Sequence, residues 1–73
     1  MNRFFVDKIN AVDRYAILSD LDQLHHLRDV LKVRLGEKVA VFDRLGNEYA
    51  AVVEEIVSSC AKLKLKEKRP PNG

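Results

Sequence analysis

The feature that most constrains the fold is residues 60–67, where apolar and cationic side chains alternate at successive positions. The apolar members are Ala61, Leu63 and Leu65, and the cationic members are Lys62, Lys64 and Lys66. Successive side chains of a β-strand point to opposite faces, so a period of two indicates a strand with one apolar and one basic face. This segment is therefore predicted to be a strand that covers a core on one side only.

Four further strands are predicted, at residues 3–6, 13–19, 37–43 and 48–57, from their content of β-branched and aromatic residues. Residues 7–12 are expected to form a loop or a turn into the next strand, and residues 44–47 a hairpin turn. A bulge is expected near the paired Glu54 and Glu55. Five short strands and one short helix predict a mainly β fold, a small β-barrel that is filled by its own side chains. Any chemistry must then lie on its outer surface.

The helix is predicted to begin after residue 20, with Ser19 or Asp20 as its N-cap. Apolar residues then recur every three or four positions, which places them on one stripe of a helix. The stripe contains Leu21, Leu24, Leu27, Val30 and Leu31. Gly36 is expected to open the turn after the segment. We expect the stripe to pack the helix onto the barrel.

Cationic residues lie beside this stripe. At about 100° per residue, His25, Arg28 and Lys32 lie within about 60° of one another on a regular helix. They form either a phosphate-contacting edge, in which arginine can bind two oxygens at once, or an ordinary solvated helix face. His26 points elsewhere, toward Asp22 and Asp29. Its alternatives are a base-stacking or proton-handling group and a surface histidine paired with one of these acids.

Other basic and aromatic residues also have two interpretations. The lysines of residues 60–67 could track a nucleic-acid backbone, or keep the outer strand face from pairing with other chains. Tyr15 and Tyr49 could stack on bases or pack at the surface. Arg3 is either a positioning cation or an ordinary surface residue. Adjacent histidines and a remote Cys60 give no metal-ligand spacing, so no metal site is predicted.

The length of the chain and its charge limit which kinds of function it can have. A single domain of 73 residues has a marginal core and little room for a deep catalytic cleft. The net charge is only +2, but the segment from Lys62 to Arg69 carries cations with Glu67 as its one acid. No glycine-rich phosphate loop or nucleophile elbow is present, so the chain alone is not expected to be an enzyme or to bind a cofactor. Its single cysteine and the lack of a signal peptide or membrane-length apolar run favour the cytoplasm.

Three motifs carry a resemblance to a known family. They are RFFV from Arg3, HHLxxVLK from His25, and GExVxVFD from Gly36 followed by GxEY from Gly46. In order and spacing they resemble the N-terminal domain of bacterial 16S rRNA uracil-N3 methyltransferases, over residues 3 to 67. Two positions depart from the family pattern. Lys32 stands where the family usually has arginine, and a lysine cannot bind two phosphate oxygens at once as a guanidinium can. Arg44 stands where the family often has glycine.

The resemblance implies a PUA-like RNA-recognition β-barrel over residues 1–68. Residues 69–73 would begin a linker to a SPOUT methyltransferase domain, absent from this chain, that binds S-adenosylmethionine (SAM) and forms a homodimer. The partner would be 16S rRNA or the small ribosomal subunit. The family motif favours His26, whereas helical geometry favours His25. The expected RNA-binding residues are therefore Arg3, His25, His26, Arg28, Lys32 and Arg34.

Two alternatives come from different functional classes. A marginal core and modest net charge also suit a protein-interaction β-barrel that docks onto a neighbouring domain or subunit. A stand-alone RNA enzyme would use His26 and Asp29 as an acid–base pair.

Overall fold

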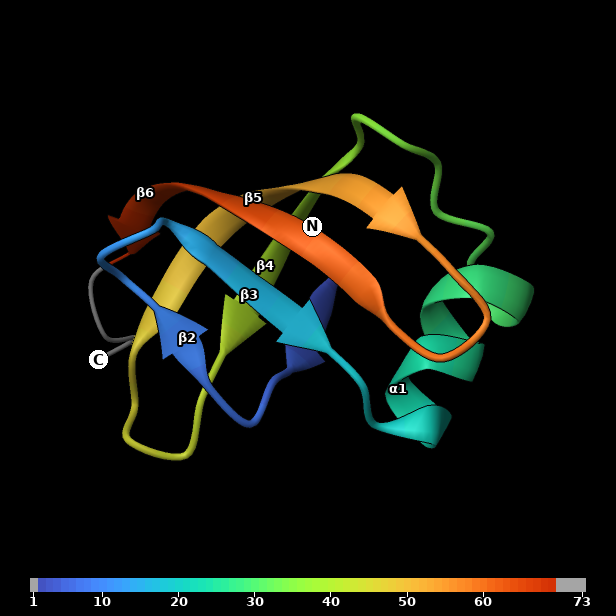
Figure 1. Cartoon of the computed structure of the whole chain (residues 1–73), viewed down its shortest axis with the longest axis horizontal. Helices are drawn as coiled ribbons and strands as arrows, with labels where there is room; N and C mark the ends of the chain where they lie inside the picture. The colour runs from blue at the N-terminus through green and yellow to red at the C-terminus, as the bar shows by residue number, and fades with distance from the viewer. Residues whose placement is uncertain (1, 70–73) are drawn as a thin grey trace.

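The structure is a computed structural model that describes residues 2–69 (Figure 1). Six strands, one short α-helix and one π-helical turn follow one another along the chain. In order they are β1 (Arg3–Phe5), β2 (Ile9–Asn10), β3 (Tyr15–Leu18), α1 (Leu21–His25), the π-turn (His26–Val30), β4 (Lys38–Phe42), β5 (Glu48–Ile56) and β6 (Ala61–Arg69). The mainly β architecture with one short helix is confirmed.

The six strands form one sheet in the order β1-β4-β5-β6-β3-β2, curved into a half-barrel. β1 pairs with β4 in parallel, and every other neighbouring pair is antiparallel. β2 lies in the segment 7–12, for which only a loop or a turn was expected, and it pairs Ile9 with Ala16 and Asn10 with Tyr15. That expectation was wrong because a strand of two residues is too short to leave a period in the sequence.

The longest hairpin, β5–β6, carries the predicted alternation. Ala61, Leu63 and Leu65 are at most 1% exposed, while the lysines between them face outward. The register of the hairpin shifts between Val53 and Glu55, which confirms the bulge expected there, and shifts again between Ala50 and Ala51. Bulges bend and twist a strand, so these two irregularities curve the hairpin around the core.

The core fills the inside of the half-barrel, and the helix closes one end of it (Figure 1). Phe4 from β1, Leu18 from β3 and Leu63 from β6 are fully buried. Leu24 and Leu27 add the helical contribution, at 1% and 0% exposure. Burying such side chains is worth about 1.5–3 kcal/mol each, so these contacts hold the helix to the sheet.

The helix is shorter than the apolar stripe predicted. Leu21 and Val30 are 72% and 56% exposed, and only Leu24 and Leu27 of the stripe are buried. The backbone N–H of Leu31 donates to the carbonyl of His26, five residues back, where an α-helix would use the carbonyl four residues back. The extra residue in this π-turn rotates the residues after it away from the stripe, and the helix ends before Lys32.

The turns agree with the sequence prediction in part. Gly46 adopts a φ of +89° in the β4–β5 turn, a conformation that glycine tolerates without strain. Arg44 is not among the residues with positive φ, so the turn does not require glycine at that position. Arg69 is the last residue of β6, and the remainder of the expected linker lies outside the described residues. Within residues 2–69, no helix is long and apolar enough to cross a membrane.

Candidate nucleic-acid interface

The start of α1 is held at two points, which positions the histidines at its end. The Asp20 carboxylate accepts hydrogen bonds from the backbone N–H groups of Asp22 and Gln23, at 3.0 and 3.1 Å. The side-chain oxygen of Gln23 in turn accepts a bond of 3.0 Å from the backbone N–H of Phe5. The helix is therefore fastened both to its own cap and to strand β1.

At the other end of the helix, the Asp29 carboxylate contacts both the Arg28 guanidinium and the His25 ring. Asp29 accepts hydrogen bonds from Nε and Nη2 of Arg28 and lies 3.0 Å from Nδ1 of His25. The hydrogen bonds from Arg28 lower the pKa of Asp29, and His25 adds to the effect. Arg28 also donates from Nη1 to the carbonyl oxygen of Ser58, at 3.3 Å. Its guanidinium therefore joins the π-turn to the β5–β6 turn, and much of its charge is met by Asp29.

His26 has different surroundings from those predicted. Its ring packs edge-on against the Phe4 ring, with centroids 6.3 Å apart and an interplanar angle of 61°. The expected pairing with Asp22 or Asp29 was wrong, because Asp29 is taken by His25 and Arg28. His26 remains exposed, so part of its ring is accessible beside its contact with the buried Phe4 ring.

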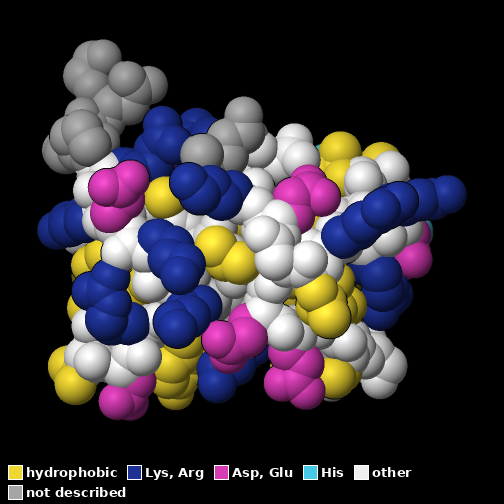
Figure 2. All heavy atoms as spheres, turned by 90° about the horizontal axis from the view of Figure 1, so that it is seen from above, with side chains coloured by type: hydrophobic (Ala, Val, Ile, Leu, Met, Phe, Trp, Pro, Cys, Tyr) yellow, Lys and Arg dark blue, Asp and Glu magenta, His cyan; other side chains and the backbone are white. Residues whose placement is uncertain are grey.

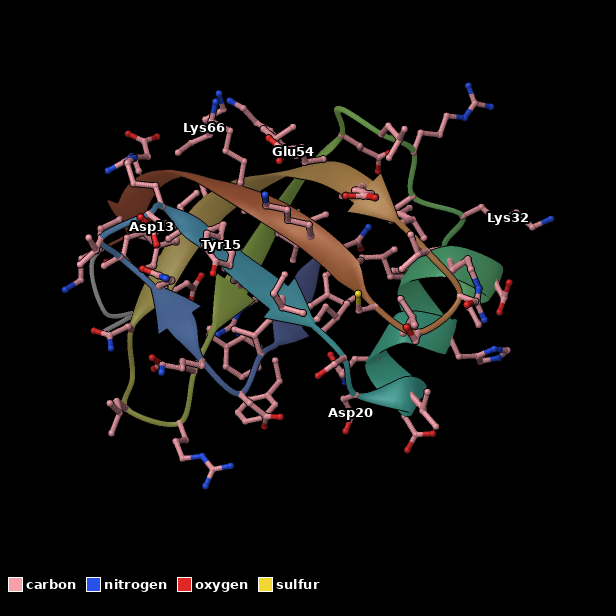
Figure 3. All side chains as sticks on the ribbon, viewed as in Figure 1. Asp13, Tyr15, Asp20, Lys32, Glu54 and Lys66 are labelled. Carbon is pink, nitrogen blue, oxygen red and sulfur yellow. The ribbon has the colours of Figure 1, made fainter. Side chains whose placement is uncertain are left out.

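Lys32 and Arg34 lie on the segment that leads from the π-turn to β4. Neither has an ion-pair partner within the described part of the chain, and both are exposed. Lys32 adopts a left-handed φ of +52°, and its side chain extends away from the body of the domain (Figure 3). Because Lys32 lies beyond the helix, the expected i, i+3, i+7 edge with His25 and Arg28 does not form. The candidate site therefore has His25 and Arg28 on the helix and the π-turn, and Lys32 and Arg34 on the loop that follows.

Arg3 belongs to a different contact group. Its Nη2 donates to Oε1 of Glu48 at 3.0 Å, and its guanidinium carbon lies 4.9 Å from the centre of the Phe42 ring. Arg69 approaches the other oxygen of Glu48 at 3.3 Å. The contacts of Arg3 therefore lie on β4 and β5 rather than on the helix. The six predicted site residues do not form one cluster: His25 and Arg28 share Asp29, whereas Arg3 binds Glu48.

Sequence analysis did not identify a hollow on the outer side of β2 and β3. It has a volume of about 280 Å³ and is lined by Asp7, Lys8, Asn10, Tyr15, Ile17 and Ser19. The available signal was the alternation of Tyr15 and Ile17 on one strand face. A second depression of about 340 Å³ lies next to the β4–β5 turn.

These hollows do not fit a large cofactor such as SAM. Both are open depressions, of about 280 and 340 Å³, near the lower limit of about 300–1,000 Å³ for sites that enclose most of a drug-sized ligand. Among residues 2–69, no group of three or more His, Cys, Asp or Glu side chains could hold a metal ion.

The family model of the RNA methyltransferase PUA domain matches residues 18–59, which is more than half of the chain. The chain belongs to this family. The match confirms the resemblance noted in the sequence and identifies the half-barrel as the PUA domain of an RNA methyltransferase. No curated protein sequence matches the chain.

Solved structures share the fold of this PUA domain. Ribosomal RNA small subunit methyltransferase E from Neisseria gonorrhoeae, solved with S-adenosyl methionine, is 26% identical, with a TM-score of 0.78 over 99% of this chain and 30% of that chain. A predicted RNA methyltransferase from Thermotoga maritima is 18% identical, with a TM-score of 0.81 over 99% of this chain and 32% of its own. The chain thus spans about a third of the length of these proteins.

Proposed function

We propose that this PUA domain recognises 16S rRNA for a cytoplasmic methyltransferase that transfers a methyl group from SAM to N3 of a uridine. The proposal is supported by the family match and by the similarity to the Neisseria gonorrhoeae enzyme, which is named for the small-subunit ribosomal RNA and binds SAM. The recognition domain extends through Arg69, the last residue of β6, and a linker leads from it to a separate SPOUT domain. That second domain holds SAM and forms the homodimer, and this domain performs no catalysis.

The observation that carries the proposal is the pair of cations on the segment after the π-turn. The side chains of Lys32 and Arg34 are exposed and form no ion pair within residues 2–69, so their charge is available to phosphate oxygens. The one acidic contact is made by the backbone, where the N–H of Arg34 donates to the Glu37 carboxylate at 3.3 Å. Phosphate contacts supply most of the affinity of RNA-binding surfaces and position the protein on its target. Lys32 and Arg34 are therefore assigned the strongest phosphate contacts.

The remaining proposed RNA-binding residues have supporting roles. Arg28 and Arg3 already bind Asp29 and Glu48, so they contribute to positioning more than to net attraction. His25 shares Asp29 with Arg28. His26 offers its exposed ring edge to a base or a sugar.

Salt-dependent binding tests the proposal. We expect a labelled hairpin from 16S rRNA to bind the domain with an affinity that falls linearly with salt on a double-logarithmic plot. Lys32→Ala and Arg34→Ala should each reduce the slope by about one, because each removes one phosphate contact. Arg44→Ala, which removes a cation of the β4–β5 turn that lies 3.7 Å from the Asp7 carboxylate, is the control and should leave the slope unchanged. Absence of binding at low salt, or equal slopes for all three variants, would contradict the proposal.

Exposed apolar side chains favour a second function, docking onto a neighbouring domain or subunit. Leu21 and Leu35 are 72% and 64% exposed, and Val30 is 56% exposed. In a longer protein that carries this domain, Leu21→Asp and Leu35→Asp should weaken assembly, measured by the thermal unfolding midpoint and by sedimentation. Unchanged assembly in both variants would rule out these residues as a docking surface.

A further inference from the structure

The outer face of β3 brings an aromatic side chain beside the lysines of β6. In the antiparallel register, Tyr15 lies opposite Lys64 and Ile17 lies opposite Lys62. The ammonium of Lys62 also lies 5.2 Å from the centre of the Tyr15 ring. Figure 2 shows the molecule from above the view of Figure 1, and many lysine and arginine side chains lie on that face. The lysine row of β6 is thus joined to an aromatic side chain on the adjacent strand.

Tyr15 and Ile17 also line the 280 Å³ hollow. Its other lining residues offer hydrogen-bonding groups of both kinds: a carboxylate acceptor on Asp7, an ammonium donor on Lys8, and a hydroxyl on Ser19 that can act as either. An apolar wall with a few polar groups suits a flat heterocycle that carries both donors and acceptors. The volume is near the lower limit of about 300–1,000 Å³ for pockets of drug-sized ligands, so one nucleobase suits it better than a whole cofactor.

The frame of the hollow is held in place. The Asn10 amide donates to the Asp13 carboxylate at 3.1 Å and accepts from the Asp13 backbone N–H at 2.9 Å. Arg14 adopts a left-handed φ of 61°, and its guanidinium donates to the backbone carbonyl of Lys66. These contacts fix the β2–β3 turn on β6, so a ligand would meet a surface that is already ordered.

The charges around the hollow divide into two zones. The Asp7 carboxylate lies 3.7 Å from Nη2 of Arg44, which offsets its negative charge at the rim. On the β6 side, Lys62 lies 3.6 Å from a carboxylate oxygen of Glu54, whereas Lys64 is exposed and has no ion-pair partner among residues 2–69. A phosphate is therefore favoured over Lys64, and a neutral base is favoured in the hollow beside Asp7.

We propose that this face binds a single-stranded stretch of RNA, with one base in the hollow against Tyr15 and the adjoining phosphate on Lys64. Such a combination of an aromatic platform with backbone-tracking cations binds single strands with little sequence preference. The inference rests on the proposed function of the domain as an RNA reader. It adds a surface on β3 and β6 to the helix-end cations, so the two surfaces would hold different parts of one RNA.

A labelled single-stranded oligouridine decamer tests the proposal on the 73-residue chain. Because bases stack on aromatic side chains, Tyr15→Leu should weaken binding by roughly fivefold to 150-fold. Tyr15→Phe keeps the ring and should bind within about twofold of the unmodified chain. Lys64→Ala should reduce the salt slope by about 0.7, the value for one phosphate of a single strand. Lys38→Ala is the matched control for charge, and circular dichroism checks that each variant is folded.

Tyrosine fluorescence gives a direct second measurement. The chain has two tyrosines and no tryptophan, so Tyr49→Phe leaves Tyr15 as the single tyrosine emitter. We expect the decamer to quench this emission in proportion to binding, after correction for RNA absorbance. This measurement does not depend on whether Tyr15→Leu folds.

The outcomes separate this inference from the proposed function. Binding of the 16S hairpin that depends on Lys32 and Arg34, with Tyr15→Leu and the tyrosine emission unaffected by RNA, overturns the inference and leaves the proposed function standing. Decamer binding that depends on Tyr15, without hairpin binding, supports the inference and overturns 16S recognition. Absence of binding to either RNA overturns both.

Discussion

At the scale of single residues, the Asp43 side chain stabilises the turn between β4 and β5 through hydrogen bonds. It is 9% exposed. One of its carboxylate oxygens accepts from the backbone N–H groups of Leu45 and Asn47, at 2.9 and 3.0 Å, and the other accepts from the Asn47 amide at 3.1 Å. Burial alone would raise the pKa of Asp43, but the hydrogen bonds from Asn47 and Leu45 outweigh it and lower the pKa below the usual value.

Replacement of Asp43 by alanine should therefore destabilise the domain. Hydrogen bonds to a charged group are worth about 1.5–3 kcal/mol, so we expect Asp43→Ala to lower the free energy of unfolding by about 2 kcal/mol at pH 7. Since the folded-state pKa is lowered, this contribution is complete above the unfolded pKa of about 3.9 and is lost as pH falls through the folded pKa. Urea denaturation at pH 7 and below pH 4 checks both points. A difference between the two proteins that does not shrink in acid would contradict the charge-based explanation.

Lys32 provides a second test at this scale. A left-handed conformation costs a residue with a side chain about 1–2 kcal/mol, whereas glycine adopts it freely at an entropic cost of about 0.5–1 kcal/mol. We therefore expect Lys32→Gly to leave the free energy of unfolding unchanged or to raise it by up to about 1.5 kcal/mol, while it weakens RNA binding. Lys64→Gly, in the interior of β6, is the comparison and should be destabilising. Thermal unfolding of both variants gives the answer, and a clear loss of stability in Lys32→Gly would argue against strain at this position.

At the scale of elements, the helix depends on its cap. α1 has five residues (Leu21–His25), and a helix this short is not stable by itself in water. Its first turn is stabilised by the two hydrogen bonds that the Asp20 carboxylate accepts. The sequence allowed either Ser19 or Asp20 as the cap, and the structure selects Asp20.

The two candidate caps can be separated by stability measurements. Removal of an N-cap side chain costs about 0.5–2 kcal/mol, so Asp20→Ala should lower the free energy of unfolding by about 1 kcal/mol. Ser19→Ala should change it by less than about 0.5 kcal/mol, since Ser19 is exposed. Equal effects of the two substitutions in urea denaturation would show that the cap bonds do not stabilise the helix.

At the scale of the whole molecule, stability depends on a small core shared by the sheet and the helix. Leu63 is fully buried on β6, whereas Leu45 is 82% exposed in the β4–β5 turn. Truncation of a buried leucine costs about 2–5 kcal/mol, a large share of the stability of about 5–15 kcal/mol that is typical of whole domains. We expect Leu63→Ala to be partly or wholly unfolded at 37 °C and Leu45→Ala to match the original chain, as read by circular dichroism. Equal melting of the two variants would contradict the assigned core.

Local patterns in the sequence predicted much of this fold. The alternation in residues 60–67 and the hairpin turn at residues 44–47 predicted where strands and turns form, because side chains of a strand alternate between its faces and glycine permits positive φ. The motifs beginning at Arg3, His25 and Gly36 were enough to indicate the family. These features depend on neighbouring residues alone, so the sequence determines them by itself.

Contacts between distant segments decided the rest. The π-turn moves Lys32 off the helix, Asp29 takes His25 and Arg28 in place of His26, and Arg3 binds Glu48 on another strand. The hollow beside Tyr15 forms only when β2 and β3 pair and β3 lies against β6. These arrangements depend on which side chain reaches a shared partner such as Asp29, and on which strands pair, so a local sequence pattern does not reveal them. The sequence by itself therefore determined most of the strands, the hairpin turn and the family, and only the tertiary structure formed β2 and decided which cations remain available to RNA.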